Sequence, residues 1–213
     1  MTEFVFVRHG STQNLEAGQW QGWSPVPLSA LGRAQALAAA TRLAGEAPTE
    51  RIFSSPLVRT RQTAEIISRA TGVEIEDSEA LKERMTATRL WGVAHADSLE
   101  YLTLQRAHRL DAGWSYEDEE PWPSLAARIR SIVALMHERS SHGGRFLFVT
   151  HGLTLRSLRA ALQAGVEAPI EEWLRAYQDV PAPECCSLTV FSADANGIQL
   201  ERWNDTSHFD GAA

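Results

Sequence analysis

Short apolar runs alternate with longer amphipathic segments along the chain. A brief run of β-branched and aromatic residues that stops at turn residues is typical of a buried strand, whereas apolar positions three or four residues apart indicate a helix. The predicted strands are residues 4–7, 52–53, 73–75, 146–149, 187–191 and 198–203. The predicted helices are residues 30–44, 56–72, 124–139 and 152–164. This order predicts one three-layer α/β/α domain with a mostly parallel central sheet.

Capping residues predict where two of these helices begin and end. Ser29 is a good N-cap for the first helix, and Gly45 is a good stop. For the second helix, Ser55 as N-cap with Pro56 at the first helical position is a strong start signal, and the helix is expected to end near Gly72. The apolar positions expected on the first helix include Leu31, Leu37 and Leu43.

The segment at about 81–122 carries scattered tryptophan, histidine and charged residues without a sustained period. We interpret it as an inserted, partly helical cap over a site. Tryptophans of this segment and of the loop after His9 could line a substrate pocket, although packing is their commoner role. Those considered are Trp20, Trp23, Trp91, Trp114 and Trp122. The chain shows no repeat or linker, so residues 1–213 are expected to form a single domain.

Composition narrows the class of protein. The chain has 213 residues, 44% of them hydrophobic and 22% charged, as in an ordinary globular domain. A net charge of −7 argues against nucleic acid or an anionic membrane as a partner. Cys185 and Cys186 are expected to be reduced thiols. Without a signal peptide or an apolar run of roughly 20 residues, we expect a cytoplasmic protein.

Two similar strand ends carry histidines. Phe-Val-Phe-Val runs into Arg8-His9-Gly10, and Phe-Leu-Phe-Val runs into Thr150-His151-Gly152. In an open α/β sheet, ligands bind outside the carboxyl ends of the strands, so His9 and His151 can meet there. A glycine after each histidine lets the chain turn and lets a ligand approach the backbone. Either histidine alone would more often be a structural residue, but the pair indicates a functional site.

Arginines identify the kind of ligand. Arg59 lies on the first turn of the second predicted helix, whose N-terminus favours anions. Its guanidinium matches phosphate oxygens, and Arg8 is a second candidate. These cations also disfavour protonation of His9, so its imidazole is kept neutral. Arg61 is expected to be a solvated residue, and Thr60 and Gln62 are expected to be structural.

These residues belong to a longer set of motifs that resembles the histidine phosphatase superfamily, in its phosphoglycerate mutase-like branch. The matching segments follow the family's order along the chain. They are residues 8–14, 21–23, 27–29, 31–36, 54–64, 81–83 and 150–152. The resemblance implies that His9 is the nucleophile that becomes phosphorylated. It also implies that Arg8, Arg59 and His151 hold the phosphoryl oxygens.

The resemblance implies further contacts around the phosphoryl group. Asn14 would add a hydrogen bond, Gln21 and Gly22 would lie in a loop that approaches the substrate, and Gly152 is placed in the same phosphate-binding set. Glu83 matches the acid that protonates the leaving oxygen and later activates water. Three other acids nearby in sequence are alternatives for that role: Asp77, Glu79 and Glu120.

The leading hypothesis is a metal-independent phosphatase that acts on a small phosphomonoester through phospho-His9, without a cofactor. The first alternative is a cofactor-dependent phosphoglycerate mutase, which needs a basic cap to hold additional anionic groups. The expected cap is acidic and offers only scattered Arg89, Arg106 and Arg109, which favours the phosphatase. A third hypothesis is a non-catalytic module that binds phosphorylated ligands. The oligomeric state is left open, with a homodimer as one option.

Overall fold

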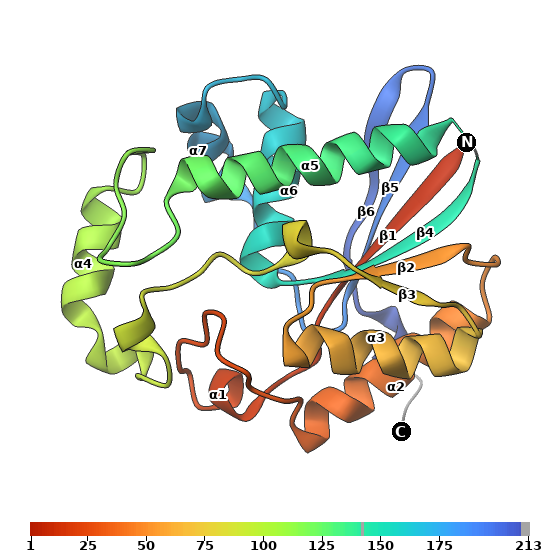
Figure 1. Ribbon diagram of the computed structural model, residues 1–213, viewed down its shortest axis with the longest axis horizontal. Coiled ribbons are helices and arrows are strands. Elements are labelled where there is room, and N and C mark those ends of the chain that lie inside the picture. Colours follow the sequence, from red (N-terminus) through yellow and green to blue (C-terminus); the bar gives the residue numbers. More distant parts are fainter. Residues whose placement is uncertain (142, 210–213) are drawn as a thin grey trace.

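The computed structural model describes residues 1–141 and 143–209, and its centre is a six-stranded sheet in the order β3-β2-β4-β1-β5-β6 (Figure 1). Neighbouring strands from β3 to β1 are parallel, whereas β5 and β6 are antiparallel to their neighbours. The bounds are β1 Thr2–Arg8, β2 Arg51–Ser54, β3 Ile75–Asp77, β4 Gly144–Thr150, β5 Leu188–Asp194 and β6 Gly197–Asp205. The predicted α/β class with a mostly parallel sheet is therefore confirmed.

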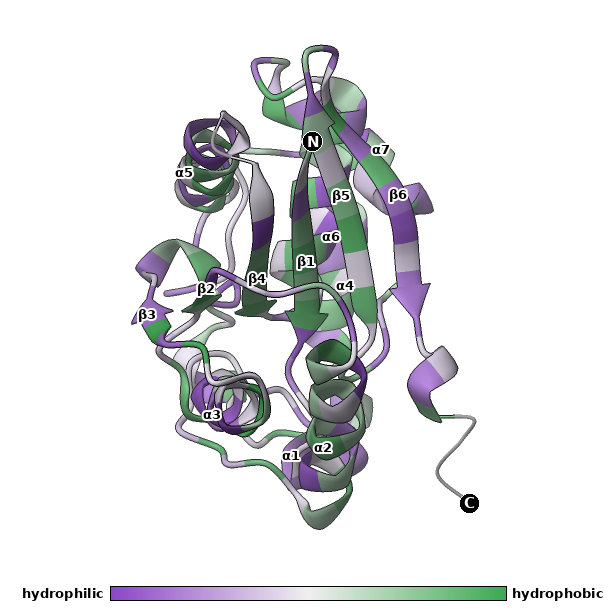
Figure 2. Ribbon diagram, turned by 90° about the vertical axis from the view of Figure 1, so that its right-hand side faces the viewer, coloured by the Kyte–Doolittle hydropathy of each residue, from purple (hydrophilic) through white to green (hydrophobic). Residues whose placement is uncertain are grey.

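Helices cover both faces of the sheet in three layers (Figures 1 and 2). One layer contains α2 and α3, and the other contains α5, α6 and α7. The helices are α1 Gln13–Glu16, α2 Ala30–Ala44, α3 Val58–Thr71, α4 Leu99–Ala107, α5 Trp122–Ser140, α6 Gly152–Ala164 and α7 Ile170–Asp179. None of the helices within the described residues has the length and apolar content to cross a membrane.

The repeated Phe-x-Phe-Val pattern of β1 and β4 builds the two cores. Because side chains alternate along a strand, Phe6 and Phe148 face α5 and α6, whereas Val7 and Val149 face α2 and α3. The rings of Phe6 and Phe148 stack with centroids 4.6 Å apart. Both strands are thus buried on both faces along their central Phe-x-Phe-Val segments, which are coloured as hydrophobic in Figure 2.

Helix α2 begins and ends as predicted but buries a different face. Ser29 caps it by accepting a hydrogen bond from the Gly32 amide, and Gly45 is its C-cap. The predicted apolar position Leu43 is buried, but Leu31 and Leu37 are 53% and 58% exposed. The buried positions are mostly small: Gly32, Ala36, Ala39, Ala40 and Leu43. The small residues allow α2 to approach α3 and the loop after His9 closely.

The N-cap residue predicted for helix α3 is wrong. The helix starts at Val58 with Leu57 as N-cap, and no side chain caps it. Ser55 lies before the helix, where its hydroxyl accepts a hydrogen bond from the Leu57 amide. The predicted end is confirmed, because Gly72 adopts the left-handed conformation that a helix C-terminus favours.

Other elements differ from the predictions or were not predicted. Strand β3 begins at Ile75, two residues later than expected. Three helices, α1, α4 and α7, were not predicted. The segment expected to form a cap contains α4 and two short 3-10 turns, Thr88–Leu90 and His95–Asp97, and α4 lies well to one side of the sheet in Figure 1.

We predict that Gly32→Ala destabilises the fold and distorts the loop after His9. A Cβ on Gly32 would overlap the carbonyl oxygen and the amide of Ser11, both backbone atoms that cannot move independently. Such overpacking costs about 1–3 kcal/mol of unfolding free energy, measured by urea denaturation. Gly45→Ala in the same helix is the matched control, because its Cβ would meet only ordinary van der Waals contacts. Equal stability of the two variants would contradict this account.

Candidate active site

His9 follows β1 directly and has a defined orientation. Its amide donates to the carbonyl of Thr150 (2.9 Å), and its side chain is 2% exposed. Its ring Nδ1 lies 2.7 Å from the carbonyl oxygen of Gly10. Because a carbonyl only accepts, Nδ1 must carry the proton, and this leaves the lone pair of a neutral ring on Nε2. The orientation is the one that a nucleophilic histidine requires.

His151 lies beside His9 with the ring centroids 5.1 Å apart. Its Nε2 is 2.9 Å from the hydroxyl of Ser55. Because that hydroxyl accepts from the Leu57 amide, its own proton is available to His151 Nε2, and the ring proton is then on Nδ1. The buried Nδ1 has no hydrogen-bond partner within the described residues. The hydrogen bond from Ser55 therefore leaves the ring proton of His151 on Nδ1, where it can be donated to a ligand.

Arg59 comes from the first turn of α3 and is 1% exposed. It donates from Nη2 to the carbonyl of Gly22 (2.8 Å) and from Nη1 to that of Ser24 (3.3 Å). These contacts fix the guanidinium, while its buried Nε has no partner within the described residues. Thr63 supports this arrangement because its hydroxyl accepts from the Gly10 amide and donates to the Arg59 carbonyl.

Arg8 supplies the second guanidinium. Its Nη1 donates to the carbonyl of Pro183 (2.5 Å), and its Nε is buried without a partner within the described residues. Gly152 makes room for this side chain, because a Cβ there would lie 3.2 Å from Arg8 Nε. Two guanidinium groups and one imidazole close to His9 thus carry buried donors without a partner within the described residues. Buried donors without partners cost free energy, and an anion would satisfy them.

Burial and charge set the protonation states. Desolvation, followed by Arg59 and Arg8, holds the pKa of His9 well below its ordinary value. Desolvation and the charge of Arg59 likewise lower the pKa of His151. Burial lowers the pKa of Arg59 to about 10, so the guanidinium is still charged at neutral pH. The site combines two neutral imidazoles with two cations.

Glu83 lies at the N-terminus of α6. Its carboxylate accepts hydrogen bonds from the amides of Leu153 (3.2 Å) and Thr154 (3.1 Å), and from the Arg84 amide (3.0 Å). Arg128 holds the backbone before it by donating to the carbonyls of residues 80, 82 and 83. A carboxylate in this position is oriented by fixed backbone donors and favoured by the helix dipole.

The other candidate acids have partners elsewhere. Asp77 pairs with Arg61 at 2.6 Å, Glu79 with Lys82 at 3.2 Å and Glu120 with Arg128 at 2.6 Å. The expected minor roles near Arg59 are also seen. Thr60 donates to backbone carbonyls and Gln62 accepts from the Leu28 amide, while Arg61 is partly exposed.

These groups line a cleft of about 190 Å³. Its lining contains Arg8, His9, Arg59 and Glu83 together with Gln21 and Gly22, six of the nine residues predicted for the site. His151 contacts the ring of His9, and Gly152 lies against Arg8; neither is part of the lining. Asn14 lies on α1 and is not among the residues that line the cleft. Further lining residues are Leu15, Gln19, Trp20, Arg84, Thr86, His95 and Leu153.

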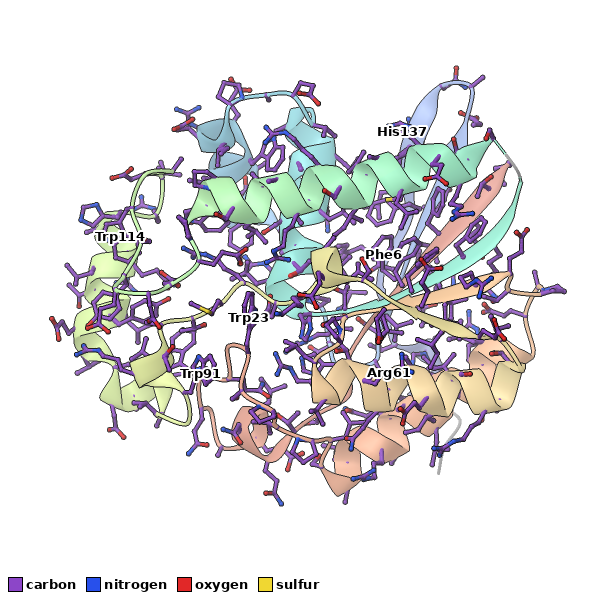
Figure 3. The ribbon with its side chains drawn as sticks, viewed as in Figure 1. Phe6, Trp23, Arg61, Trp91, Trp114 and His137 are labelled. Atoms are coloured by element: carbon purple, nitrogen blue, oxygen red, sulfur yellow. The ribbon has the colours of Figure 1, made fainter. Side chains whose placement is uncertain are left out.

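Several residues of this site were not singled out in the sequence. Ser55 carried a capping signal that concealed its contact with His151, and Arg84 gave no signal beyond its position next to Glu83. The tryptophans differ in role: Trp20 lines the cleft, while Trp23 donates to the Glu83 carbonyl (2.6 Å). Figure 3 shows Trp23 and Trp91 between the end of the sheet and α4, and His137 on α5 at a distance from them.

Comparisons with known proteins agree with this geometry. A family model described as the histidine phosphatase superfamily (branch 1) matches residues 4–206. A curated protein of Escherichia fergusonii, named probable phosphoglycerate mutase GpmB, is 33% identical and is aligned over 100% of this chain and 97% of its own length.

Solved structures give the same fold. A mycobacterial glucosyl-3-phosphoglycerate phosphatase in complex with VO3 has a TM-score of 0.81 and 28% identity, covering 97% of this chain and 100% of that one. The alpha-ribazole phosphatase of Shigella flexneri has a TM-score of 0.75 at 20% identity, with 96% of each chain covered, and supports the fold alone. With its family model matched along nearly the whole chain, this protein belongs to the histidine phosphatase superfamily, branch 1.

Proposed function

We propose that the protein is a metal-independent phosphomonoester phosphatase that acts through a phosphohistidine on His9. The observation that carries the proposal is the set of buried donors around His9: Arg8 Nε, Arg59 Nε and His151 Nδ1. Three unpartnered donors beside a neutral imidazole fit a phosphoryl group with its charge spread over three oxygens. The arginines supply charge neutralisation that a metal ion provides in other phosphotransferases.

The reaction runs in two steps. In the first, the lone pair on His9 Nε2 forms a bond to phosphorus, the bond to the leaving oxygen breaks, and the protonated carboxyl group of Glu83 gives that oxygen its proton. In the second, the Glu83 carboxylate takes a proton from water as the water oxygen bonds to phosphorus. The bond between phosphorus and Nε2 then breaks, which releases inorganic phosphate and restores neutral His9 and protonated Glu83.

A phosphoglycerate mutase is the second candidate, because the curated relatives carry that name and a mutase would use the same His9 chemistry. A mutase returns the phosphoryl group to a substrate that also bears a carboxylate. In the cleft, Arg8 and Arg59 are committed to the phosphoryl group and Arg84 is paired with Glu119 at 3.3 Å. This charge distribution favours the phosphatase. Isomerisation of 3-phosphoglycerate in the presence of 2,3-bisphosphoglycerate, without phosphate release, would select the mutase instead.

We expect His9→Ala to lower kcat for p-nitrophenyl phosphate by about a thousandfold or more, because the variant has no nucleophile. Wild-type activity should persist in EDTA, and the intact mass of wild-type protein quenched at neutral pH should show one added phosphoryl group. His137→Ala, an exposed position on α5, is the control and should behave as wild type. Activity of His9→Ala at the wild-type rate would refute the mechanism.

We expect Glu83→Gln to slow hydrolysis of alkyl phosphates by about a hundredfold or more, because an alkoxide needs a proton to leave. Formation of the phosphoenzyme from p-nitrophenyl phosphate should suffer much less, since nitrophenolate leaves without protonation. Burst kinetics with the two substrates measure this difference. Glu79→Gln, whose side chain is 77% exposed, is the matched control. A uniform loss with both substrates would assign Glu83 another role.

The lowered pKa values of His9 and His151 predict a pH-dependent stability. Below about pH 6.5 the unfolded chain protonates these imidazoles while the native protein keeps them neutral, so the unfolding free energy decreases as the pH falls. Each histidine contributes a slope approaching 1.4 kcal/mol per pH unit, about the energy of one unit of pKa. Urea denaturation at pH 7.5 and 5.5 should therefore show a shallower decrease for His9→Gln than for wild type. Equal decreases would show that His9 is not kept neutral.

A further inference from the structure

The cleft extends beyond the phosphoryl donors toward a second set of residues. This part is lined by Gln19, Trp20, Thr86 and His95. Backbone hydrogen bonds join the two segments that carry them: Trp20 and Val93 (3.0 Å), Gly92 and Trp20 (2.8 Å), and His95 and Gly18 (2.8 Å). The loop after His9 and the segment before α4 thus form one wall of the cleft.

Two rings on this wall are held in place. The indole of Trp20 donates from Nε1 to the hydroxyl of Ser98 (2.9 Å) and packs edge-on against Tyr101 at 5.2 Å. The imidazole of His95 lies 4.2 Å from the Trp20 ring, measured between centroids. Because these contacts already fix the rings, binding a ligand against them would cost little ordering entropy.

On this side of the cleft, a buried carboxylate compensates the charge of the lining cation, although Arg84 Nη2 has no hydrogen-bond partner within the described residues. Among the described residues that line it, Arg84 is the cation on this side, and it is buried 3.3 Å from the carboxylate of Glu119. Its Nε donates to the carbonyl of Glu120 (2.9 Å). Burial lowers the pKa of His95, so that ring is neutral at pH 7.

Polar groups on this wall can still recognise hydroxyls. Gln19, Gln21 and Thr86 line the cleft, and their side chains carry groups that donate or accept hydrogen bonds. The side-chain oxygen of Gln21 already accepts from the Thr12 hydroxyl (2.8 Å), which leaves its NH₂ group as a donor. The volume of about 190 Å³ is smaller than the roughly 300 Å³ at which sites for drug-sized ligands begin. The cleft has room for a phosphoryl group and one small ring.

We propose that the substrate is the phosphomonoester of a small, uncharged, hydroxyl-bearing ring, as in a monosaccharide phosphate, and that Trp20 and His95 select that ring. The inference rests on the proposed phosphatase function and specifies the alcohol. An apolar ring face packs against the indole, while the ring hydroxyls bind the amides. A phosphorylated carboxylic acid would be a poor substrate, because the cation on this side of the cleft, Arg84, is already paired with the carboxylate of Glu119.

Matched pairs of substrates test the charge of the alcohol. Glycerol 3-phosphate and 3-phosphoglycerate differ by a carboxylate on the same three-carbon skeleton, and phenyl phosphate and 4-carboxyphenyl phosphate differ in the same way. We expect kcat/KM to be about tenfold or more higher for the uncharged member of each pair. Equal or higher values for the carboxylates would overturn this inference and leave the phosphatase intact. Absence of turnover and of phosphoenzyme with every substrate would overturn both.

A second measurement tests the ring. The ratio of kcat/KM for glucose 6-phosphate to that for methyl phosphate reports the contribution of the ring. Trp20→Leu should lower this ratio by about three- to tenfold, the range expected from loss of one aromatic contact. Trp114→Leu, which removes a tryptophan outside the cleft lining, should leave the ratio at its wild-type value. Circular dichroism establishes that both variants are folded, and His95→Ala repeats the test without removing the indole. An unchanged ratio in Trp20→Leu and His95→Ala would refute selection by this wall.

Discussion

The site depends on the parallel register of β1 and β4. This register pairs Arg8 with Thr150, so the residues that follow, His9 and His151, leave the sheet side by side. The hydrogen bond from the His9 amide to the Thr150 carbonyl extends the pairing one step beyond the strands. A shift by one residue would exchange the two core faces of β1, which the alternation of phenylalanine and valine opposes. The packing of the core therefore fixes the distance between the imidazoles.

Burial gives these residues their chemistry at a cost in stability. Arg59 is almost fully buried, and its Nε has no acceptor within the described residues, while His151 Nδ1 is in the same condition. Unsatisfied buried donors destabilise a fold unless something else compensates, and here the aromatic core between β1, β4 and α5 provides the compensation. The same desolvation keeps the imidazoles neutral. A bound phosphoryl group would accept hydrogen bonds from these donors. Binding would therefore recover the free energy that the folded protein loses by leaving them unpaired.

The sequence was most informative where one local signal matches the global structure. The paired apolar runs ending in histidine predicted β1, β4 and the meeting of His9 with His151, because strand ends of a parallel sheet share one edge. Sequence analysis failed where one residue type suits two roles. Ser55 is a typical helix N-cap residue, but its hydroxyl contacts His151 and does not cap α3. Arg84 was missed because its role arises from distant partners, Glu119 and the ring of Trp122, which no local pattern reveals. The segment around Arg84 has no repeating pattern of apolar positions, because separate contacts hold each of its turns in place.

Gly22 connects the phosphoryl end of the cleft to the wall formed by the loop after His9 and the segment before α4. Its carbonyl accepts from Arg59, and its left-handed backbone (φ +49°) brings it against the indole of Trp91, where a Cβ would overlap the ring. Trp91 in turn donates to the carbonyl of Thr86 (2.9 Å) on the wall. A substitution in the wall that moves Trp91 would therefore also move Gly22, and with it the carbonyl that Arg59 binds. Because His9 and His151 are instead held by the ends of β1 and β4, the wall can vary while the nucleophile keeps its position.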